Sequence, residues 1–356
     1  MQALDGLPEF TQKAFHHVPL AVVDAVIAFN KQAESDERFD GIHLDNEPYT
    51  LLGWHEPTRR DQILVEFLEL NAECQRRVRA AKGLVFGVDI PFWWQELDPH
   101  TGKPIGDVTF NGRRKPASFH CIDLLDNVGI MNYRDQADGA DGLIAHAQQI
   151  LAYSERSGGA TIFMGIETDL PPPRDVWFVA GLPRKRFEMA LRGPARDWSS
   201  ISRFDDLKLW TLDDGDNVHV GVELPPQPAP DQMERVQRTL QEIAKRFGAV
   251  RSGTTKSQVL ATRKQAELFV NKDPEWSNFR SRDFSRGDGQ PEQTGFMATS
   301  VMLPKITFGD NSVKDLLTQT SAAEDVFRNY KNYAGIAIHH FESYRTLNRT
   351  GVRASR

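Results

Sequence analysis

Short apolar segments alternate with longer amphipathic stretches along the chain. The apolar segments end in polar residues, are too short for helices, and are too continuously apolar for strands with one exposed face. A run of this kind is typical of a parallel strand that is buried on both faces. Five segments predict such strands: 39–45 (FDGIHLD), 84–90 (LVFGVDI), 128–133 (VGIMNY), 161–167 (TIFMGIE) and 334–340 (AGIAIHH).

Helical periodicity predicts helices over residues 20–34, 57–82, 139–156 and 313–330. Pro57 suits a first helical turn, and Gly83 and Gly158 lie just past helix ends, where a left-handed residue is favoured. Strands that alternate with helices predict an α/β fold with a parallel sheet, either a barrel or a doubly wound sheet. We favour a (β/α)8 TIM barrel, because no G-x-G-x-x-G or Walker motif supports a nucleotide-binding sheet.

One interval interrupts this alternation. From residue 171 to residue 293 the order is strand, helix, two strands and helix, with Asp214-Gly215 as a hairpin turn and 272–292 as a long polar loop. We therefore expect a barrel domain of residues 1–170 and 294–356, with residues 171–293 as an inserted α+β subdomain. An insert after a strand emerges where parallel barrels hold their active sites, so it is a candidate lid or substrate-binding wall.

Charge and composition exclude several classes of protein. The net charge of −6 is spread along the chain, which leaves no basic surface for nucleic acid or for a membrane. No run approaches the roughly 20 apolar residues of a membrane span, and no signal peptide opens the chain. As written the protein is expected in the cytoplasm, or exported if a preceding segment is missing. Cys74 and Cys121 lie outside any C-x-x-C motif and are expected to be buried thiols.

Ionisable side chains end every predicted strand. In parallel α/β folds these ends converge on one site, so we expect the polar residues there to act together. The set comprises Asp45, Asn46, Glu47, Asp89, Asn132, Tyr133, Arg134, Asp135, Glu167, His339, His340 and Glu342.

The segment 40–48 (DGIHLDNEP) has the clearest pattern. Strand alternation directs Ile42 and Leu44 toward the helices, and it directs His43, Asp45 and Glu47 toward the barrel axis. Repulsion by the neighbouring Asp45 is expected to keep the carboxyl of Glu47 protonated, as a general acid requires near neutral pH.

The same segment resembles the D-G-x-D-x-D-x-E signature on strand four of the family 18 glycoside hydrolases, the chitinase-like barrels. Asp40, Gly41, Asp45 and Glu47 match the signature, whereas His43 replaces its middle Asp. The resemblance implies that Glu47 is the general acid and that Asp45 positions the N-acetyl group of the substrate as the nucleophile.

A second motif extends this resemblance. GIMNYRD carries Met131 and Tyr133 of the M-x-Y-D pattern of strand six, with Arg134 in place of the Asp, and His339-His340 replaces the tryptophan of strand eight. The resemblance gives Tyr133 a hydrogen bond to the acetamido group.

Asn46-Glu47-Pro48 is also similar to the N-E-P that ends strand four of the clan A glycoside hydrolases. There the Glu is the acid/base, and a Glu that ends strand seven is the nucleophile. If residues 39–45 form strand four, counting forward makes 161–167 strand seven, which gives Glu167 the position of the nucleophile. Such pairs of carboxyls lie about 5–5.5 Å apart. The two resemblances share the fold, Glu47 and the reaction class.

The strand count conflicts with a complete barrel. The residues before position 39 are too few for three βα units of about thirty residues each. We expect a barrel that is incomplete at its N-terminus or permuted, or a different strand numbering.

The expected function is therefore the cleavage of a glycosidic bond in a carbohydrate substrate, without a cofactor. Trp93 and Trp94 directly follow the second predicted strand and can stack on sugar rings. The expected catalytic residues are Glu47, Asp45 and Glu167. The expected substrate-binding residues are His43, Asn46, Asp89, Trp93, Trp94, Asn132, Tyr133, Arg134, His339 and His340.

Two alternatives belong to other classes. In a non-catalytic carbohydrate-binding barrel, Arg134 would pair with Glu47 or Asp135 and hold it ionised. In a metal-dependent hydrolase, His43, His339 and His340 would bind the ion.

Overall fold

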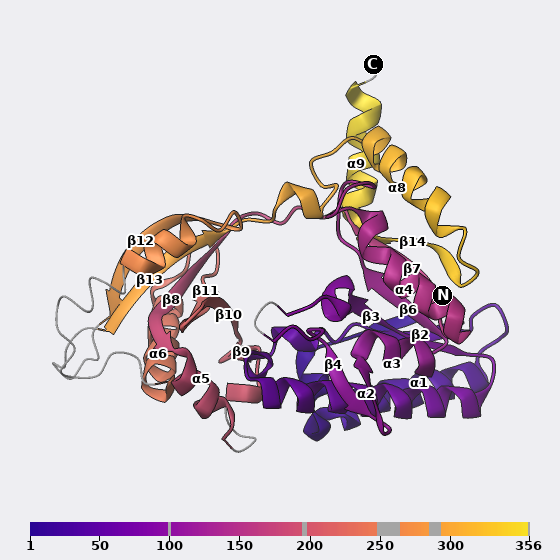
Figure 1. Ribbon diagram of the computed structural model, residues 1–356, viewed down its shortest axis with the longest axis horizontal. Coiled ribbons are helices and arrows are strands. Elements are labelled where there is room, and N and C mark those ends of the chain that lie inside the picture. Colours follow the sequence, from indigo (N-terminus) through magenta and orange to yellow (C-terminus); the bar gives the residue numbers. More distant parts are fainter. Residues whose placement is uncertain (99–100, 194–197, 248–263, 285–292, 355–356) are drawn as a thin grey trace. The chain divides into compact units, whose positions relative to one another are not determined.

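The computed structural model describes residues 1–98, 101–193, 198–247, 264–284 and 293–354. The chain forms two compact units (Figure 1). The first contains Met1–Thr50, Arg60–Leu170 and Pro304–Arg356, and the second contains Leu51–Arg59 and Pro171–Leu303. The expected insert of residues 171–293 ends where strand β13 (Gln293–Ser300) begins, and β13 lies in the second unit.

Six parallel strands form the sheet of the first unit, and they are neighbours in chain order. The predicted α/β fold with a parallel sheet is thus confirmed, and all five predicted strands are present. In the described residues β1 and β14 are the two edges of the sheet, so it is an open half-barrel and not a closed eight-stranded barrel. The strands are β1 (Gln2–Asp5), β2 (Gly41–Leu44), β3 (Val85–Pro91), β6 (Asn127–Met131), β7 (Thr161–Glu167) and β14 (Tyr333–His339).

The four predicted helices are also present. Pro57 is the first residue of α2, and Gly158 closes α4 in a left-handed conformation with φ 62°. The helices that accompany the first sheet are α1 (His17–Gln32), α2 (Pro57–Ala81), α3 (Ala117–Leu124), α4 (Leu143–Ser157), α8 (Val313–Phe327) and α9 (Phe341–Ala354). A hairpin of β4 (Asp107–Phe110) and β5 (Arg113–Pro116) precedes α3.

Alternate residues of the first sheet form its core. These side chains are almost completely buried, because period-two alternation sends them all to the same face of the sheet. They are Ile42, Leu44, Phe86, Val88, Ile90, Val128, Ile130, Ile162, Met164 and Ile166. The intervening positions, which include His43, Asp89 and Glu167, belong to the other face.

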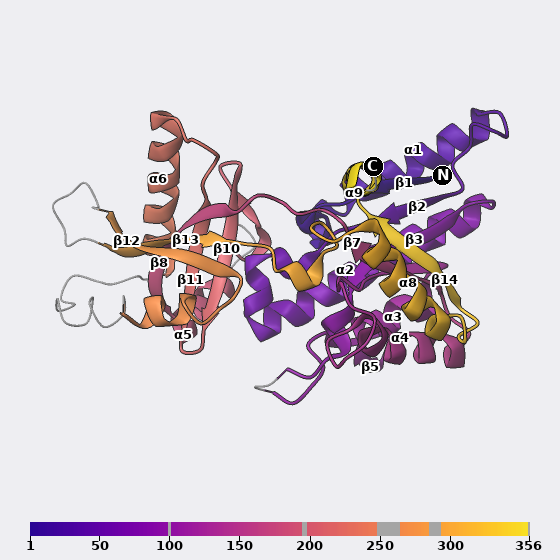
Figure 2. The same cartoon turned by 90° about the horizontal axis from the view of Figure 1, so that it is seen from above.

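An antiparallel sheet forms the second unit, in the order β12-β13-β8-β11-β10-β9. Its strands are β8 (Arg174–Pro183), β9 (Arg203–Phe204), β10 (Leu207–Asp214), β11 (Asn217–Glu223), β12 (Trp276–Phe284) and β13. Figure 2 shows α6 (Pro230–Phe247) beside this sheet. Apolar residues of α6 and of α5 (Arg184–Leu191) pack in one core with β8 and β11, and helical residues 264–270 contribute to a second core.

The predicted loop over residues 272–292 is wrong over the range of β12. A bulge between Ser277 and Arg280, with Asn278 at φ 54°, interrupts the alternation of the strand. Trp276 and Phe279 therefore pack in the same core although they lie three residues apart. This spacing does not match the period of two by which a strand is recognised. Residues 285–292 lie outside the described residues.

The expected hairpin turn and the expected buried cysteines are also present. Gly215 follows Asp214 in the hairpin of β10 and β11, with φ 60°. Cys74 and Cys121 are free and buried. Among the described helices, none combines the length and the apolar content that crossing a membrane requires. Short 3-10 helices complete the chain: η1 (Pro8–Thr11), η2 (Lys13–Phe15), η3 (Pro48–Thr50), η4 (Leu52–His55), η5 (Phe92–Gln95), η6 (Trp198–Ser200) and η7 (Pro304–Ile306).

Candidate active site

Four carboxylates surround Tyr133 at the carboxyl ends of the strands of the first unit. Burial, and then the charges of Glu167, Asp89, Asp45 and Glu47 in that order, raise the pKa of the Tyr133 phenol. These carboxylates come from the ends of β2, β3 and β7, and Tyr133 follows β6. The structure thus brings together polar groups from four strands.

Asp45 has the most unusual environment of these carboxylates. Burial raises its pKa to about 7, and the charges of Glu47 and Asp89 act in the same direction. Its Oδ1 atom is buried and has no hydrogen-bond partner among the described residues. We expected the protonated carboxyl at Glu47, whereas the carboxyl whose pKa the structure raises into the neutral range is Asp45.

Glu47 lies in a tight turn. Its backbone is left-handed, with φ 43°, and its carbonyl oxygen accepts hydrogen bonds from the Thr50 amide at 3.1 Å and the Thr50 hydroxyl at 3.0 Å. This turn brings the hydroxyl of Tyr49 to Oε1 of Glu47, to which it donates a hydrogen bond. The sequence analysis did not identify Tyr49. The available signal was a phenol two positions after a glutamate, at the end of a strand.

His43 and Asp89 form a pair on neighbouring strands. Nε2 of His43 lies 3.0 Å from Oδ2 of Asp89, with 13% and 31% of the side chains exposed. Gly129 on β6 leaves the space for this pair, because a Cβ there would lie 2.0 Å from Oδ1 of Asp89 and 3.7 Å from Nε2 of His43.

Replacing Gly129 by alanine is therefore expected to displace Asp89 and to lower the free energy of unfolding by about 1–3 kcal/mol, the usual cost of overpacking. Urea denaturation measures this loss. An Asp89→Ala background is the control, because without the carboxylate the added methyl group has room. Equal losses in both backgrounds would show that the Asp89 side chain does not fill this space.

Glu167 is buried, and both of its oxygens are engaged. Oε1 accepts the backbone N–H groups of Thr168 at 2.8 Å and Asp169 at 2.6 Å, while Oε2 lies 2.8 Å from Nδ1 of His339. The hydrogen bond to Glu167 raises the pKa of His339. Glu167 thus stabilises a positively charged imidazole, whose ring centre lies 6.2 Å from that of Tyr133.

The two tryptophans have different environments. Trp94 is fully buried and packs edge-on against Phe67 at 5.5 Å, so it is a core residue and cannot serve as the expected sugar platform. Trp93 is partly exposed and contacts the ring of Tyr49 edge-on at 5.3 Å.

Two asparagines of the expected set are also buried. The side-chain amide of Asn132 donates to the carbonyl of Leu143 at 2.8 Å and thereby ties the end of β6 to the start of α4. Asn46 is fully buried, and neither polar atom of its amide has a partner among the described residues.

Arg134 belongs to a different network. Its Nε atom lies 2.7 Å from Oδ1 of Asp141, and its guanidinium group stacks on the ring of Phe92 at 4.7 Å. Lys305 also contacts Asp141, at 2.8 Å. The ion pair of Arg134 is therefore with Asp141 and not with Glu47 or Asp135, the partners that the non-catalytic alternative required.

The three histidines of the metal alternative have separate partners. His43 lies beside Asp89, His339 beside Glu167, and Nδ1 of His340 beside Oγ of Ser343 at 3.0 Å. Within the described ranges no group of three or more His, Cys, Asp or Glu side chains could hold a metal ion. His340 instead lines a hollow of about 520 Å³, together with Asp169, Asp310 and Glu342 among others.

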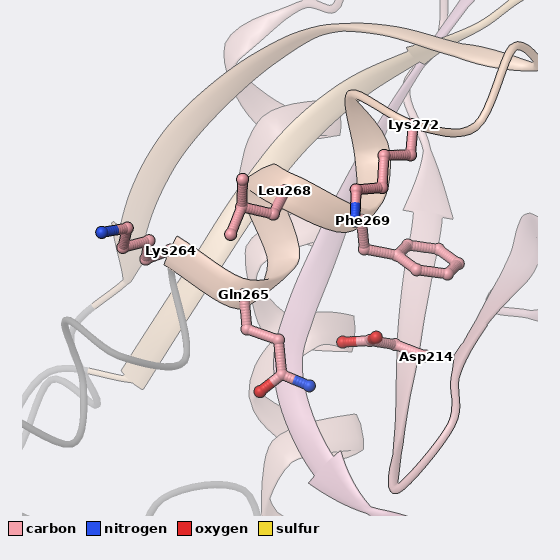
Figure 3. Close-up of a pocket in the computed structure, with 6 residues that line it drawn as sticks. All are labelled: Asp214, Lys264, Gln265, Leu268, Phe269 and Lys272. Carbon is pink, nitrogen blue, oxygen red and sulfur yellow. The ribbon is translucent and has the colours of Figure 1, made fainter.

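The second unit has a hollow of its own, of about 450 Å³. Figure 3 shows the ring of Phe269 and the carboxylate of Asp214 on one side of helical residues 264–270, with Lys264 directed away from both. Asp214 also lies 3.3 Å from Nε2 of the buried His219. The expected site residues all belong to the first unit.

Comparisons with known proteins give little further information. No model of a known protein family matches the chain, and no curated protein matches it. Among solved structures it is similar to the spore cortex-lytic enzyme SleL of Bacillus megaterium QM B1551, with 13% sequence identity and a TM-score of 0.29. The match covers 70% of this chain and 53% of that chain, so this chain spans about half of that protein. Because this likeness is slight, the function must be argued from the site itself.

Proposed function

We propose that this protein is a glycoside hydrolase that cleaves a carbohydrate substrate with Glu47 as the proton donor. The supporting observation is the carboxylate cluster around Tyr133, in which Asp45 has a pKa of about 7. Carboxyls whose environments give them different proton affinities are the usual acid and base groups of glycosidases.

The contacts of the carboxylates favour one mechanism over the other. Both oxygens of Glu167 are held by backbone amides and by His339, which leaves this residue poorly placed for nucleophilic attack. Asp45 has a buried oxygen without a partner, which can accept the N–H of an acetamido group. In this mechanism the acetamido oxygen of the substrate attacks the anomeric carbon while Glu47 protonates the departing oxygen. Glu47 then takes a proton from the water that opens the cyclic intermediate.

Activity on a panel of oligosaccharides, measured by the release of reducing ends, tests the proposed function. Cleavage of at least one member that carries 2-acetamido sugars is expected. Binding without cleavage across the panel would contradict the proposal and favour the carbohydrate-binding alternative.

Glu167→Gln separates the two mechanisms. If Glu167 only supports His339, kcat should fall by less than about tenfold, and hydrolysis should still require the acetamido group. The measurement compares the variant and the wild type on matched substrates with an acetamido or a hydroxyl group at C2. Equal wild-type rates on both substrates, with activity abolished in the variant, would instead identify Glu167 as a covalent nucleophile.

A further inference from the structure

We propose that Tyr49 is a positioning residue that fixes the carboxyl group of Glu47 for proton transfer, an inference that rests on the proposed function. The hydroxyl of Tyr49 donates to Oε1 of Glu47, and no described residue bonds Oε2 in the structure. The contact thus assigns the two oxygens different tasks: Oε1 is held by the phenol, and Oε2 carries the proton to the leaving group.

Packing fixes Tyr49 itself. Its ring contacts Trp93 edge-on at 5.3 Å, and its hydroxyl lies 3.9 Å from Sδ of Met131 at the end of β6. The phenol therefore has one defined position relative to the sheet. A glutamate side chain has three rotatable bonds, so a fixed donor at one oxygen removes much of the freedom that proton transfer must otherwise overcome.

Tyr49 remains a hydrogen-bond donor over the pH range in which the enzyme can work. Burial, and then the charge of Glu47, raise the pKa of Tyr49 well above its usual value. The phenol is thus itself neither the acid nor the base of the reaction, and it acts through Glu47.

The test is Tyr49→Phe, which removes only the hydroxyl group, assayed on two N-acetyl-β-glucosaminides. A 2,4-dinitrophenyl leaving group departs without protonation, whereas a methoxyphenyl leaving group needs a general acid. The variant should lose about tenfold in kcat/KM on the methoxyphenyl substrate and less than about twofold on the dinitrophenyl substrate, because kcat/KM reports the step in which the leaving group departs. A merely structural role would lower both rates alike, and equal losses would overturn the proposal.

Tyr153→Phe is the matched control. The hydroxyl of Tyr153 also donates to a carboxylate of the first unit, Asp123, at 3.1 Å, but it lies outside the proposed site. This variant should retain the wild-type rates on both substrates. If Tyr153→Phe shows the same dependence on the leaving group, the assignment to Tyr49 is wrong.

Crystal structures of the wild type and of Tyr49→Phe provide a second readout that needs no turnover. The Glu47 carboxyl should leave its position or occupy several positions in the variant. An unmoved carboxyl would overturn the positioning role, even if the wild type cleaves neither glycoside. Absence of cleavage together with a displaced carboxyl would contradict the proposed function and support the positioning role.

Discussion

Replacing Glu47 by glutamine is expected to lower kcat for glycoside hydrolysis by a factor of about 10²–10⁴, the usual contribution of a general acid. Glutamine keeps the shape of the side chain and can accept the hydrogen bond from Tyr49, but it has no acidic proton to transfer to the leaving group. Because Glu47 also takes the proton from water in the second step, the dependence on the leaving group is expected in kcat/KM, which should fall strongly for sugar leaving groups and little for 2,4-dinitrophenyl glycosides. Steady-state kinetics on both kinds of substrate measures the effect.

Glu324→Gln is the control for this prediction. Oε1 of Glu324 also accepts a tyrosine hydroxyl, that of Tyr333 at 3.1 Å, but Glu324 lies on α8, outside the carboxylate cluster. The control variant should keep the wild-type kcat. A Glu47→Gln enzyme that cleaves sugar leaving groups at the wild-type rate would remove Glu47 from the mechanism.

Replacing Asp45 by asparagine is expected to abolish most of the activity and yet to stabilise the protein at alkaline pH. The pKa of Asp45 rises from 3.8 to about 7 on folding, mainly through burial. The folded protein therefore binds more protons than the unfolded chain between these values. The stabilisation from Asp45 is fully present below pH 3.8 and is lost as the pH rises through 7.

The size of this effect follows from the shift. Three pKa units correspond to at most about 4 kcal/mol, and screening by solvent reduces this to roughly 1–2 kcal/mol. Asp45→Asn should exceed the wild type in its free energy of unfolding by this amount at pH 8. The difference should shrink as the pH is lowered toward 4. Urea denaturation at both pH values measures it.

Asp325→Asn on α8 serves as the reference, because this exposed carboxylate lies outside the cluster. Its pH profile should follow that of the wild type. If the Asp45→Asn profile is also parallel to that of the wild type, Asp45 does not titrate near pH 7. The kcat/KM profile of the wild type should rise through about pH 7 on its acid side, because the ionised carboxylate accepts the acetamido N–H more strongly than the protonated carboxyl does.

The strands of the first sheet could be predicted because their signal is local. A strand that is buried on both faces reads as a short apolar run, and all five such runs form strands. For β14 the expected burial on both faces is wrong, because in the described residues β14 is an edge of the sheet and is mostly exposed, with Ile338 39% exposed. Strand β1 lacks this signal. It has only four residues, and Leu4 is 70% exposed.

The sequence could predict only those residues of the candidate site that lie at the ends of strands. That Asp45, Glu47, Asp89 and Glu167 share one environment follows from parallel strands alone. The contact of Tyr49 with Glu47 depends instead on the left-handed backbone of Glu47 in a turn. The periodicity of apolar residues carries no information about such a turn.

The exposure of residues just after a strand was likewise not predictable. Trp93 and Trp94 are adjacent in sequence and lie in one 3-10 turn, yet Trp94 is completely buried and Trp93 is not. Sequence composition identifies an aromatic pair at this point, but only the packing of Phe67 decides which ring enters the core.

The contact between Glu167 and His339 joins residues 172 positions apart, because most of the second unit is encoded between β7 and β14. Closing so long a loop costs about 1–2 kcal/mol more than closing an ordinary βα connection, so the last strand gains little by pairing early. The two segments that flank this loop contact each other within the first unit, where the hydroxyl of Thr307 donates to the carbonyl of Asp169 at 2.7 Å. A second unit that folds first and brings its ends together would remove most of this entropic cost. The imidazole of His339 is then expected to reach the Glu167 carboxylate only after residues 171–303 have folded, because β14 follows them in the chain.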